Sequence, residues 1–130
     1  MADVTPTVFV VDDDISVRES LELLITSAGW RPEMFVSAQD FLSHPRSTVP
    51  CCLVLDVSLP GLDGLSLLRQ MAEAGVLKTS KVVVVTTRSV EAEMIKAMEL
   101  GAVDYITKPV SLPVLLRRLR SALAGASGVT

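Results

Sequence analysis

The stretch from Cys51 to Gly64 limits the possible folds most strongly, because a strand, an acid and a turn follow one another directly. Residues 51–55 read CCLVL, all small or apolar, which is typical of a strand buried on both faces of a parallel sheet. The run ends at Asp56, and Pro60 and Gly61 then favour a sharp turn. Open α/β sheets bind ligands at the carboxyl ends of their strands, so this stretch predicts an acid at a ligand site.

The rest of the chain alternates short apolar runs with segments whose apolar residues recur at helical spacing. The predicted strands cover residues 7–11, 31–36, 51–55, 81–86 and 103–107. The predicted helices cover about residues 15–28, 38–43, 65–74, 90–100 and 112–123. Strands that alternate with helices through right-handed crossovers predict an α/β fold. We expect a doubly wound, five-stranded parallel sheet with the flavodoxin-like strand order 2-1-3-4-5.

Polar residues mark the ends of these elements. Asp14, or Ser16 in a capping box with Glu19, is placed to begin the first helix, and Gly29 is placed to end it. The predicted strand at residues 31–36 is less apolar than the others, which indicates an edge of the sheet.

Composition narrows the class of protein. With 130 residues and 49% hydrophobic residues, the chain fits one globular domain. A net charge of −3 and a pI near 5.1 argue against a nucleic-acid surface. No stretch approaches the roughly 20 apolar residues that span a bilayer, and no secretory signal is visible at the N-terminus. We therefore expect no membrane contact and a cytoplasmic location.

The two cysteines, Cys51 and Cys52, are adjacent in the predicted buried strand, where their side chains point to opposite faces. Buried, reduced thiols fit this placement better than a disulfide, a metal site or a nucleophile.

In the predicted order, strands 1 and 3 are neighbours, and both end in acids. Asp12 and Asp13 follow the first strand, and Asp56 ends the third. Carboxylates brought this close repel one another, so either a pKa rises or a hard cation neutralises them. Mg²⁺ bound by carboxylates, waters and phosphate oxygens fits better than a closed protein cage. No cluster of His or Cys offers a transition-metal site, and His44 stands alone in a predicted loop.

Two more functional groups end strands at the same edge, Thr86 after the fourth strand and Lys108 after the fifth. Either alone could be an ordinary strand or surface residue. Together, a hydroxyl and an ammonium that face a metal-bound acid predict a site for a dianionic phosphoryl group.

These residues and their surroundings resemble the receiver domain of two-component response regulators. The resemblance rests on Asp12-Asp13, residues 56–64 (DVSLPGLDG), Thr86 and residues 105–109 (YITKP), and it covers residues 7–123. Segments 10–18, 37–42 and 101–106 are most similar to FixJ-type receivers. The resemblance implies a receiver domain at residues 1–124 and a tail, or the start of a linker, at residues 125–130.

The family implies that Asp56 is the phosphoacceptor, which attacks a phosphohistidine on a sensor histidine kinase. It implies a Mg²⁺ (or Mn²⁺) ion bound directly by Asp13 and Asp56, largely through water by Asp12, and by the backbone carbonyl of Ser58. Lys108 would share the charge of the phosphoryl oxygens with this ion.

The resemblance also implies a switch. The phosphoryl group would draw the Thr86 hydroxyl inward, and Tyr105 would rotate into the vacated space. This movement would change the face formed by the fourth helix, the fifth strand and the fifth helix. The other interpretation of Tyr105 is an ordinary surface aromatic.

Five further residues are expected to shape the site. The Thr87 backbone would contact the phosphoryl group, while its side chain is bulkier than the Ala or Gly often found there. Ser58 and Arg88 stand at positions where side chains in the family tune the rate at which water attacks the phosphoryl group. The Arg88 side chain would either pair with the phosphate or point into solvent. A turn at Pro60 and Gly61 would let Ser58 offer its carbonyl.

A cis peptide bond between Lys108 and Pro109 would aim the Lys108 ammonium at the acids.

The function that the resemblance implies is a signalling switch. The chain would be no enzyme beyond its own phosphorylation and slow dephosphorylation. Expected partners are a sensor histidine kinase and, after phosphorylation, a second copy of the chain. DNA would be contacted only through a C-terminal domain outside this sequence, which makes the expected output transcriptional.

Three alternatives stay open. The first is a single-domain phosphorelay or protein-binding regulator. The second is an aspartyl phosphatase of the haloacid-dehalogenase kind, although Ser58 stands where such enzymes carry their second acid. The third is a pseudo-receiver, against which the complete set of acids, threonine and lysine argues.

Overall fold

The computed structural model describes residues 5–44, 51–56, 64–73, 75, 80–86, 91–109 and 111–126. Within these ranges, strands and helices alternate as the sequence predicts. The strands are β1 (Thr7–Val11), β2 (Arg31–Phe35), β3 (Cys51–Asp56), β4 (Ser80–Thr86) and β5 (Asp104–Thr107). The helices are α1 (Ile15–Ser27), α2 (Ala38–Leu42), α3 (Gly64–Glu73), α4 (Glu91–Leu100) and α5 (Leu112–Ala126).

The strands form one parallel sheet in the order β2-β1-β3-β4-β5, which confirms the predicted order and the edge position of β2. The register explains why acids meet at one edge. Val11 of β1 is paired with Leu55 of β3, so Asp12 and Asp56 come next on two neighbouring strands. The sheet itself therefore brings together two acids that lie far apart in the sequence.

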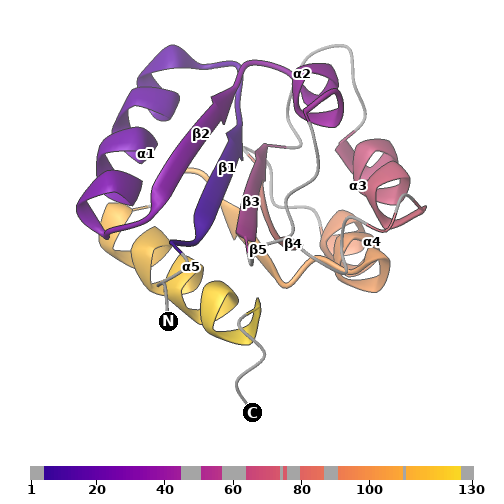
Figure 1. Ribbon diagram of the computed structural model, residues 1–130. Helices are drawn as coiled ribbons and strands as arrows, with labels where there is room; N and C mark the ends of the chain where they lie inside the picture. The colour runs from indigo at the N-terminus through magenta and orange to yellow at the C-terminus, as the bar shows by residue number, and fades with distance from the viewer. Residues whose placement is uncertain are drawn as a thin grey trace.

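Helices cover both faces of the sheet (Figure 1). α1 and α5 lie on one face, and α2, α3 and α4 lie on the other. Each face has its own apolar core, because successive strand residues point to opposite sides. Cys51 packs in the core under α2–α4 and Cys52 in the core under α1 and α5, so the two side chains point to opposite faces as predicted. Both are buried, and neither forms a disulfide within the described ranges.

Aromatic rings fix the corner where β2 meets α2. Phe9, Phe35 and Phe41 pack against one another with ring centroids 5.4–6.1 Å apart. The carbonyl of Phe35 accepts a hydrogen bond from the N–H of Asp12 at 3.1 Å. The ladder between β1 and β2 thus continues past the end of β1 and anchors the first acid of the site.

The ends of α1 decide between the two predicted caps. Asp14 has extended backbone angles, and its side chain accepts a hydrogen bond from the N–H of Ser16 at 2.8 Å. Ser16 is already helical, so the capping box with Glu19 is wrong and Asp14 is the cap. At the other end Gly29 has a φ of +88°, a left-handed conformation that glycine adopts without strain.

The last helix begins at Leu112 as predicted but ends later than predicted. Helical spacing predicts one apolar stripe on this helix, formed by Leu112, Leu115, Leu116, Leu119 and Leu123. Leu115, Leu119 and Leu123 are buried, but Leu112 is 41% exposed because it begins the helix, where few neighbours surround it. α5 continues to Ala126, beyond the predicted end at residue 123. Ala124 and Ala126 favour the helix, whereas Gly125 between them does not. Within the described ranges, we find no helix long and apolar enough to span a bilayer.

Candidate functional site

Three carboxylates meet where β1 and β3 end. One oxygen of each of Asp12, Asp13 and Asp56 lies within 4.8 Å of the others. Asp12 and Asp56 are only 3% and 5% exposed, whereas Asp13 is exposed. The group therefore has two acids fixed in the protein and one that faces solvent, which leaves a side open to small ligands. Hard oxygen donors in this arrangement fit a Mg²⁺ ion.

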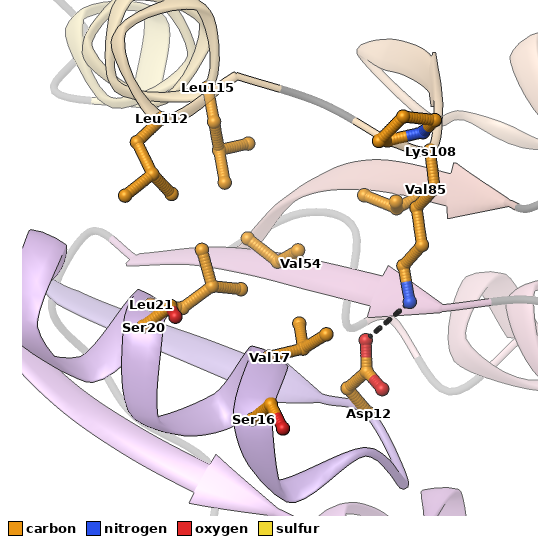
Figure 2. Close-up of a pocket in the computed structure, with 11 residues that line it drawn as sticks. Asp12, Ser16, Val17, Ser20, Leu21, Val54, Val85, Lys108, Leu112 and Leu115 are labelled. Atoms are coloured by element: carbon orange, nitrogen blue, oxygen red, sulfur yellow. Dashed lines mark hydrogen bonds and ion pairs between the residues drawn. The ribbon is translucent and has the colours of Figure 1, made fainter.

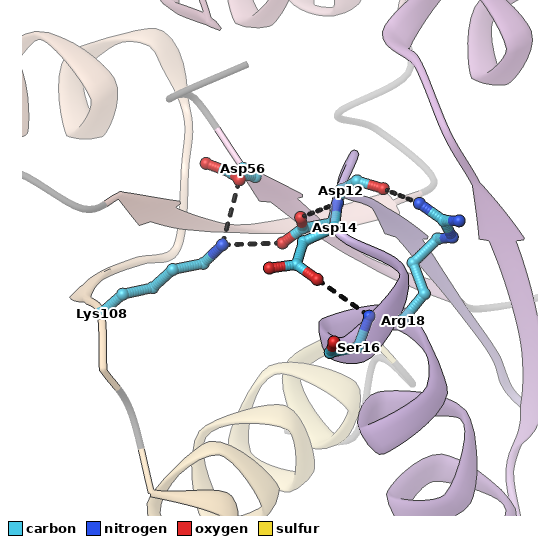
Figure 3. A network of polar contacts seen from close by, with 6 residues as sticks. All are labelled: Asp12, Asp14, Ser16, Arg18, Asp56 and Lys108. Carbon is cyan, nitrogen blue, oxygen red and sulfur yellow. Dashed lines mark hydrogen bonds and ion pairs between the residues drawn. The ribbon is translucent and has the colours of Figure 1, made fainter. Parts of the chain in front are cut away.

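Lys108 joins two of these acids (Figure 3). Its Nζ lies 2.8 Å from Oδ2 of Asp12 and 3.1 Å from Oδ2 of Asp56. Burial lowers the pKa of Lys108, but the hydrogen bonds to Asp12 and Asp56 and their charges outweigh it, so the pKa lies above its ordinary value. The side chain is therefore an ammonium at neutral pH. Because the Lys108 ammonium lies between Asp12 and Asp56, it can contact an anionic group attached to either carboxylate.

The loop after β1 is held by several hydrogen bonds. Oδ1 of Asp12 accepts the N–H of Asp14 at 2.9 Å, and the carbonyl of Asp12 accepts Nη1 of Arg18 at 2.8 Å. Sequence patterns alone assign no role to Arg18. The only hint of a role for Arg18 in the sequence is its position in the first turn of the helix that follows Asp12 and Asp13.

Thr86 and Lys108 come to the same edge, as predicted. Thr86 ends β4, is buried, and is paired with Thr107 of β5, which directly precedes Lys108. The backbone N–H of Lys108 donates to the carbonyl of Thr86 at 2.7 Å. The bond between Lys108 and Pro109 is cis, which agrees with the resemblance.

Tyr105 lies away from the acids, on β5. Its ring is half-buried and packs against the core under α2–α4. Tyr105 of β5 is paired with Val84 of β4, and Thr86 lies two residues after Val84 on β4. Because strand side chains alternate, Tyr105 and Thr86 extend from the same face of the sheet.

Five predicted residues lie outside the described ranges, so their expected roles remain predictions: Ser58, Pro60, Gly61, Thr87 and Arg88.

A cavity of about 480 Å³ lies beside the acids, between α1 and α5 (Figure 2). Asp12 and Lys108 form its polar end. Its other walls are mainly apolar side chains of α1, β3, β4 and α5: Val17, Leu21, Val54, Val85, Leu112 and Leu115. The stem of Lys108 therefore follows an apolar surface while its ammonium reaches the acids, as long cationic side chains commonly do.

Comparison with known proteins agrees with this geometry. The family model described as "Response regulator receiver domain" matches residues 8–120. The transcriptional regulatory protein AfsQ1 of Streptomyces coelicolor is 35% identical over 118 residues, 91% of this chain and 51% of that protein. The response regulator MprA of Mycobacterium avium is 38% identical over 116 residues, 89% of this chain and 50% of that protein. The chain thus spans about half the length of these curated relatives.

Among solved structures, full-length FixJ from B. japonicum superposes with a TM-score of 0.81 at 35% identity. This match covers 92% of the present chain and 58% of FixJ. The matched family segment spans most of the chain, from β1 into α5, and includes the three acids and Lys108. The chain belongs to the family of response regulator receiver domains.

Proposed function

We propose that this domain is a phosphorylation-controlled signalling switch in which Asp56 accepts a phosphoryl group from a phosphohistidine of a sensor kinase. The observation that carries the proposal is the contact of Lys108 with both Asp12 and Asp56 inside a group of three carboxylates. A nucleophile, a ligand set for a hard cation and a fixed ammonium are the parts that phosphoryl transfer requires.

In the proposed reaction, a carboxylate oxygen of Asp56 attacks phosphorus in line with the bond to the histidine nitrogen. The P–N bond breaks, its electron pair stays on the imidazole, and an acyl phosphate forms on Asp56. Lys108 lies 3.1 Å from Asp56, so its ammonium is in reach of a phosphoryl oxygen attached there. β3 keeps Asp56 in place because the strand is buried along its whole length.

Asp12, Asp13 and Asp56, with the backbone carbonyl of Ser58, are the residues proposed to hold Mg²⁺ or Mn²⁺. When bound, the ion supplies positive charge that stabilises the phosphoryl oxygens during transfer. Asp13 is the exposed member of the described acids, so we propose that the ion enters from its side.

The output is proposed to follow from Thr86 and Tyr105, which extend from one face of the sheet on neighbouring strands. A phosphoryl group on Asp56 adds a charge of up to about −2. This charge shifts the population toward the active conformation only if that conformation binds it better than the inactive one does. Exposed apolar residues on and after α4 support a partner surface on the face formed by α4, β5 and α5: Met94, Ile95, Met98 and Val103.

A second copy of the chain is the proposed partner at this face, and transcription is the proposed output. The match covers only 51% of the relative named as a transcriptional regulatory protein, which supports an output domain elsewhere in such proteins.

The test is phosphoryl labelling by acetyl phosphate or phosphoramidate with Mg²⁺, followed by intact mass. One added phosphoryl group per chain is expected in the native protein and none in Asp56→Asn. Asp40→Asn, a matched change at an exposed position of α2, should label normally. Light scattering of the same samples measures the proposed dimer.

Absent labelling, or labelling that survives Asp56→Asn, contradicts the proposal. Sustained multiple turnover of p-nitrophenyl phosphate would instead favour an aspartyl phosphatase.

A further inference from the structure

Arg18 lies in the first turn of α1 and reaches back to the loop that carries two of the acids (Figure 3). Its Nη1 donates to the main-chain carbonyl of Asp12 at 2.8 Å, and the contact is partly buried. A guanidinium beside an acidic group would be expected to pair with a carboxylate. Here Lys108 forms ion pairs with Asp12 and Asp56, and Nη1 of Arg18 donates to a main-chain oxygen.

The contact fixes a peptide plane. The carbonyl of Asp12 and the N–H of Asp13 belong to the same planar peptide unit. A hydrogen bond that orients this carbonyl therefore also orients the backbone from which the Asp13 side chain leaves. Asp13 is exposed, so burial does not hold its carboxylate in place.

Two further hydrogen bonds hold Asp12 itself, through its N–H and its side chain. The N–H of Asp12 donates to the carbonyl of Phe35 at 3.1 Å, and Oδ1 of Asp12 accepts the N–H of Asp14 at 2.9 Å. Asp14 in turn caps α1 by accepting the N–H of Ser16. Arg18 supplies the contact at the Asp12 carbonyl and ties the acidic loop to the helix that follows.

We propose that Arg18 is a positioning residue that holds the Asp12–Asp13 peptide so that the Asp13 carboxylate meets those of Asp12 and Asp56 around a divalent cation. This inference rests on the proposed function and assigns a role within it. Groups that orient metal ligands commonly change metal affinity by about 10- to 100-fold when they are removed.

The sign of the effect separates positioning from charge. A positive guanidinium near the acids repels a divalent cation, so its removal should strengthen cation binding if charge alone mattered. If Arg18 positions Asp13, its removal should weaken cation binding in spite of the lost repulsion. The two roles therefore predict changes in opposite directions.

The experiment is a calorimetric titration of the unphosphorylated protein with Mg²⁺, repeated with Mn²⁺. Arg18→Met loses both the charge and the donor, and we expect about tenfold weaker binding. Arg18→Lys keeps the charge and one donor group, and should recover part of the affinity. Arg120→Met removes the same charge from an exposed position on α5 and should leave the affinity within about twofold of the native value.

A second readout needs no metal. Hydrogen exchange of the Asp14 amide, which donates to Asp12, should be about tenfold faster in Arg18→Met, while amides of the core strands keep their native rates. A change that only destabilised the fold would accelerate the core amides as well and lower the thermal midpoint.

Unchanged or tighter cation binding in Arg18→Met, with the native protein binding and being labelled normally, overturns the inference and leaves the proposed function standing. A uniform rise in amide exchange also overturns it, since this shows a structural role only. If the native protein neither binds Mg²⁺ nor is labelled, the proposed function fails and the inference fails with it.

Discussion

The two ends of β3 are equally buried but chemically opposite. The strand begins with Cys51 and Cys52 and ends with Asp56, and all three residues are at most 5% exposed. Burial raises the pKa of the Cys52 thiol to about 12, with a smaller contribution from the neighbouring Cys51, so the thiol stays neutral. Asp56 instead lies beside the ammonium of Lys108.

Equal burial therefore goes with different electrostatic surroundings at the two ends of β3. At the amino end of β3, Sγ of Cys51 lies 2.9 Å from the hydroxyl of Ser80, a neutral partner on the next strand. At the carboxyl end, Asp12 after β1 and Lys108 after β5 lie beside Asp56, so charged groups from three strands meet. Asp56 thus lies beside a cation, Nζ of Lys108 at 3.1 Å, whereas Cys51 lies beside a neutral hydroxyl.

The largest expected effect concerns the thiols. At pH 8 a thiol with the ordinary pKa of 9.0 is about one-tenth ionised, whereas a pKa of about 12 leaves roughly a thousandfold less thiolate. Because the thiolate is the reactive form, Cys52 should react with a disulfide reagent at least about a thousandfold more slowly in the native protein than in denaturant. Site-resolved mass spectrometry of timed samples measures this ratio.

Ser20→Cys places a thiol at an exposed position of α1 and serves as the matched control for reagent and pH. This introduced thiol should react at nearly the same rate in native and denatured protein. Comparable rates at Cys52 and at position 20 would break the contrast between the two ends of β3.

The next effect is at the carboxyl end. Lys108→Met removes the ammonium that lies between Asp12 and Asp56, whose side chains are 5% and 6% exposed. Labelling by acetyl phosphate should slow by about 100-fold, the usual loss when one charged donor to a transition state is removed. Without divalent cations, the free energy of unfolding should fall by about 2 kcal/mol, because two buried carboxylates lose their shared partner.

Asp56→Asn should reduce that stability loss, since it removes one of the repelling carboxylates. A chemical denaturation cycle over the two single variants and the double variant measures the coupling. Lys96→Met, a matched change at an exposed position of α4, should affect neither labelling nor stability. Equal stability loss with and without Asp56→Asn would show that the lysine does not act through this acid.

Much of this site could be predicted because each of its acids, Thr86 and Lys108 follows or ends a strand. Strand ends are visible as changes in composition, and the alternation of elements then sets which ends are neighbours. The strand order and the meeting of Asp12, Asp56 and Lys108 were accessible in this way.

Contacts that depend on the approach of a helix to a loop were not accessible. The hydrogen bond from Arg18 to Asp12 requires the direction in which α1 leaves the loop, and sequence spacing does not contain it. Leu112 fits the apolar stripe of α5 by spacing, yet it begins the helix at the edge of the cavity and is partly exposed. Periodicity describes a helix in isolation, whereas burial depends on its neighbours.

The smallest expected effect tests the amino end of β3 alone. Cys51 is paired with Ser80 in the register of β3 and β4, and either side chain can donate in their buried contact. Ser80→Ala should lower the free energy of unfolding by about 1 kcal/mol, the usual net value of one buried hydrogen bond. Chemical denaturation of Ser80→Ala, with the exposed Ser20→Ala as the control within about 0.5 kcal/mol of the native protein, measures it.

The rate of phosphoryl labelling should be unchanged in Ser80→Ala. Ser80 begins β4, whereas Thr86 ends the same strand beside the acids, so the lost contact and the labelled acid lie at opposite ends of the sheet. A labelling rate that falls together with stability would mean that the two ends of β3 act as one unit. An unchanged rate would assign stability to the amino end and chemistry to the carboxyl end, because a buried neutral pair contributes no charge to the transfer of a phosphoryl group.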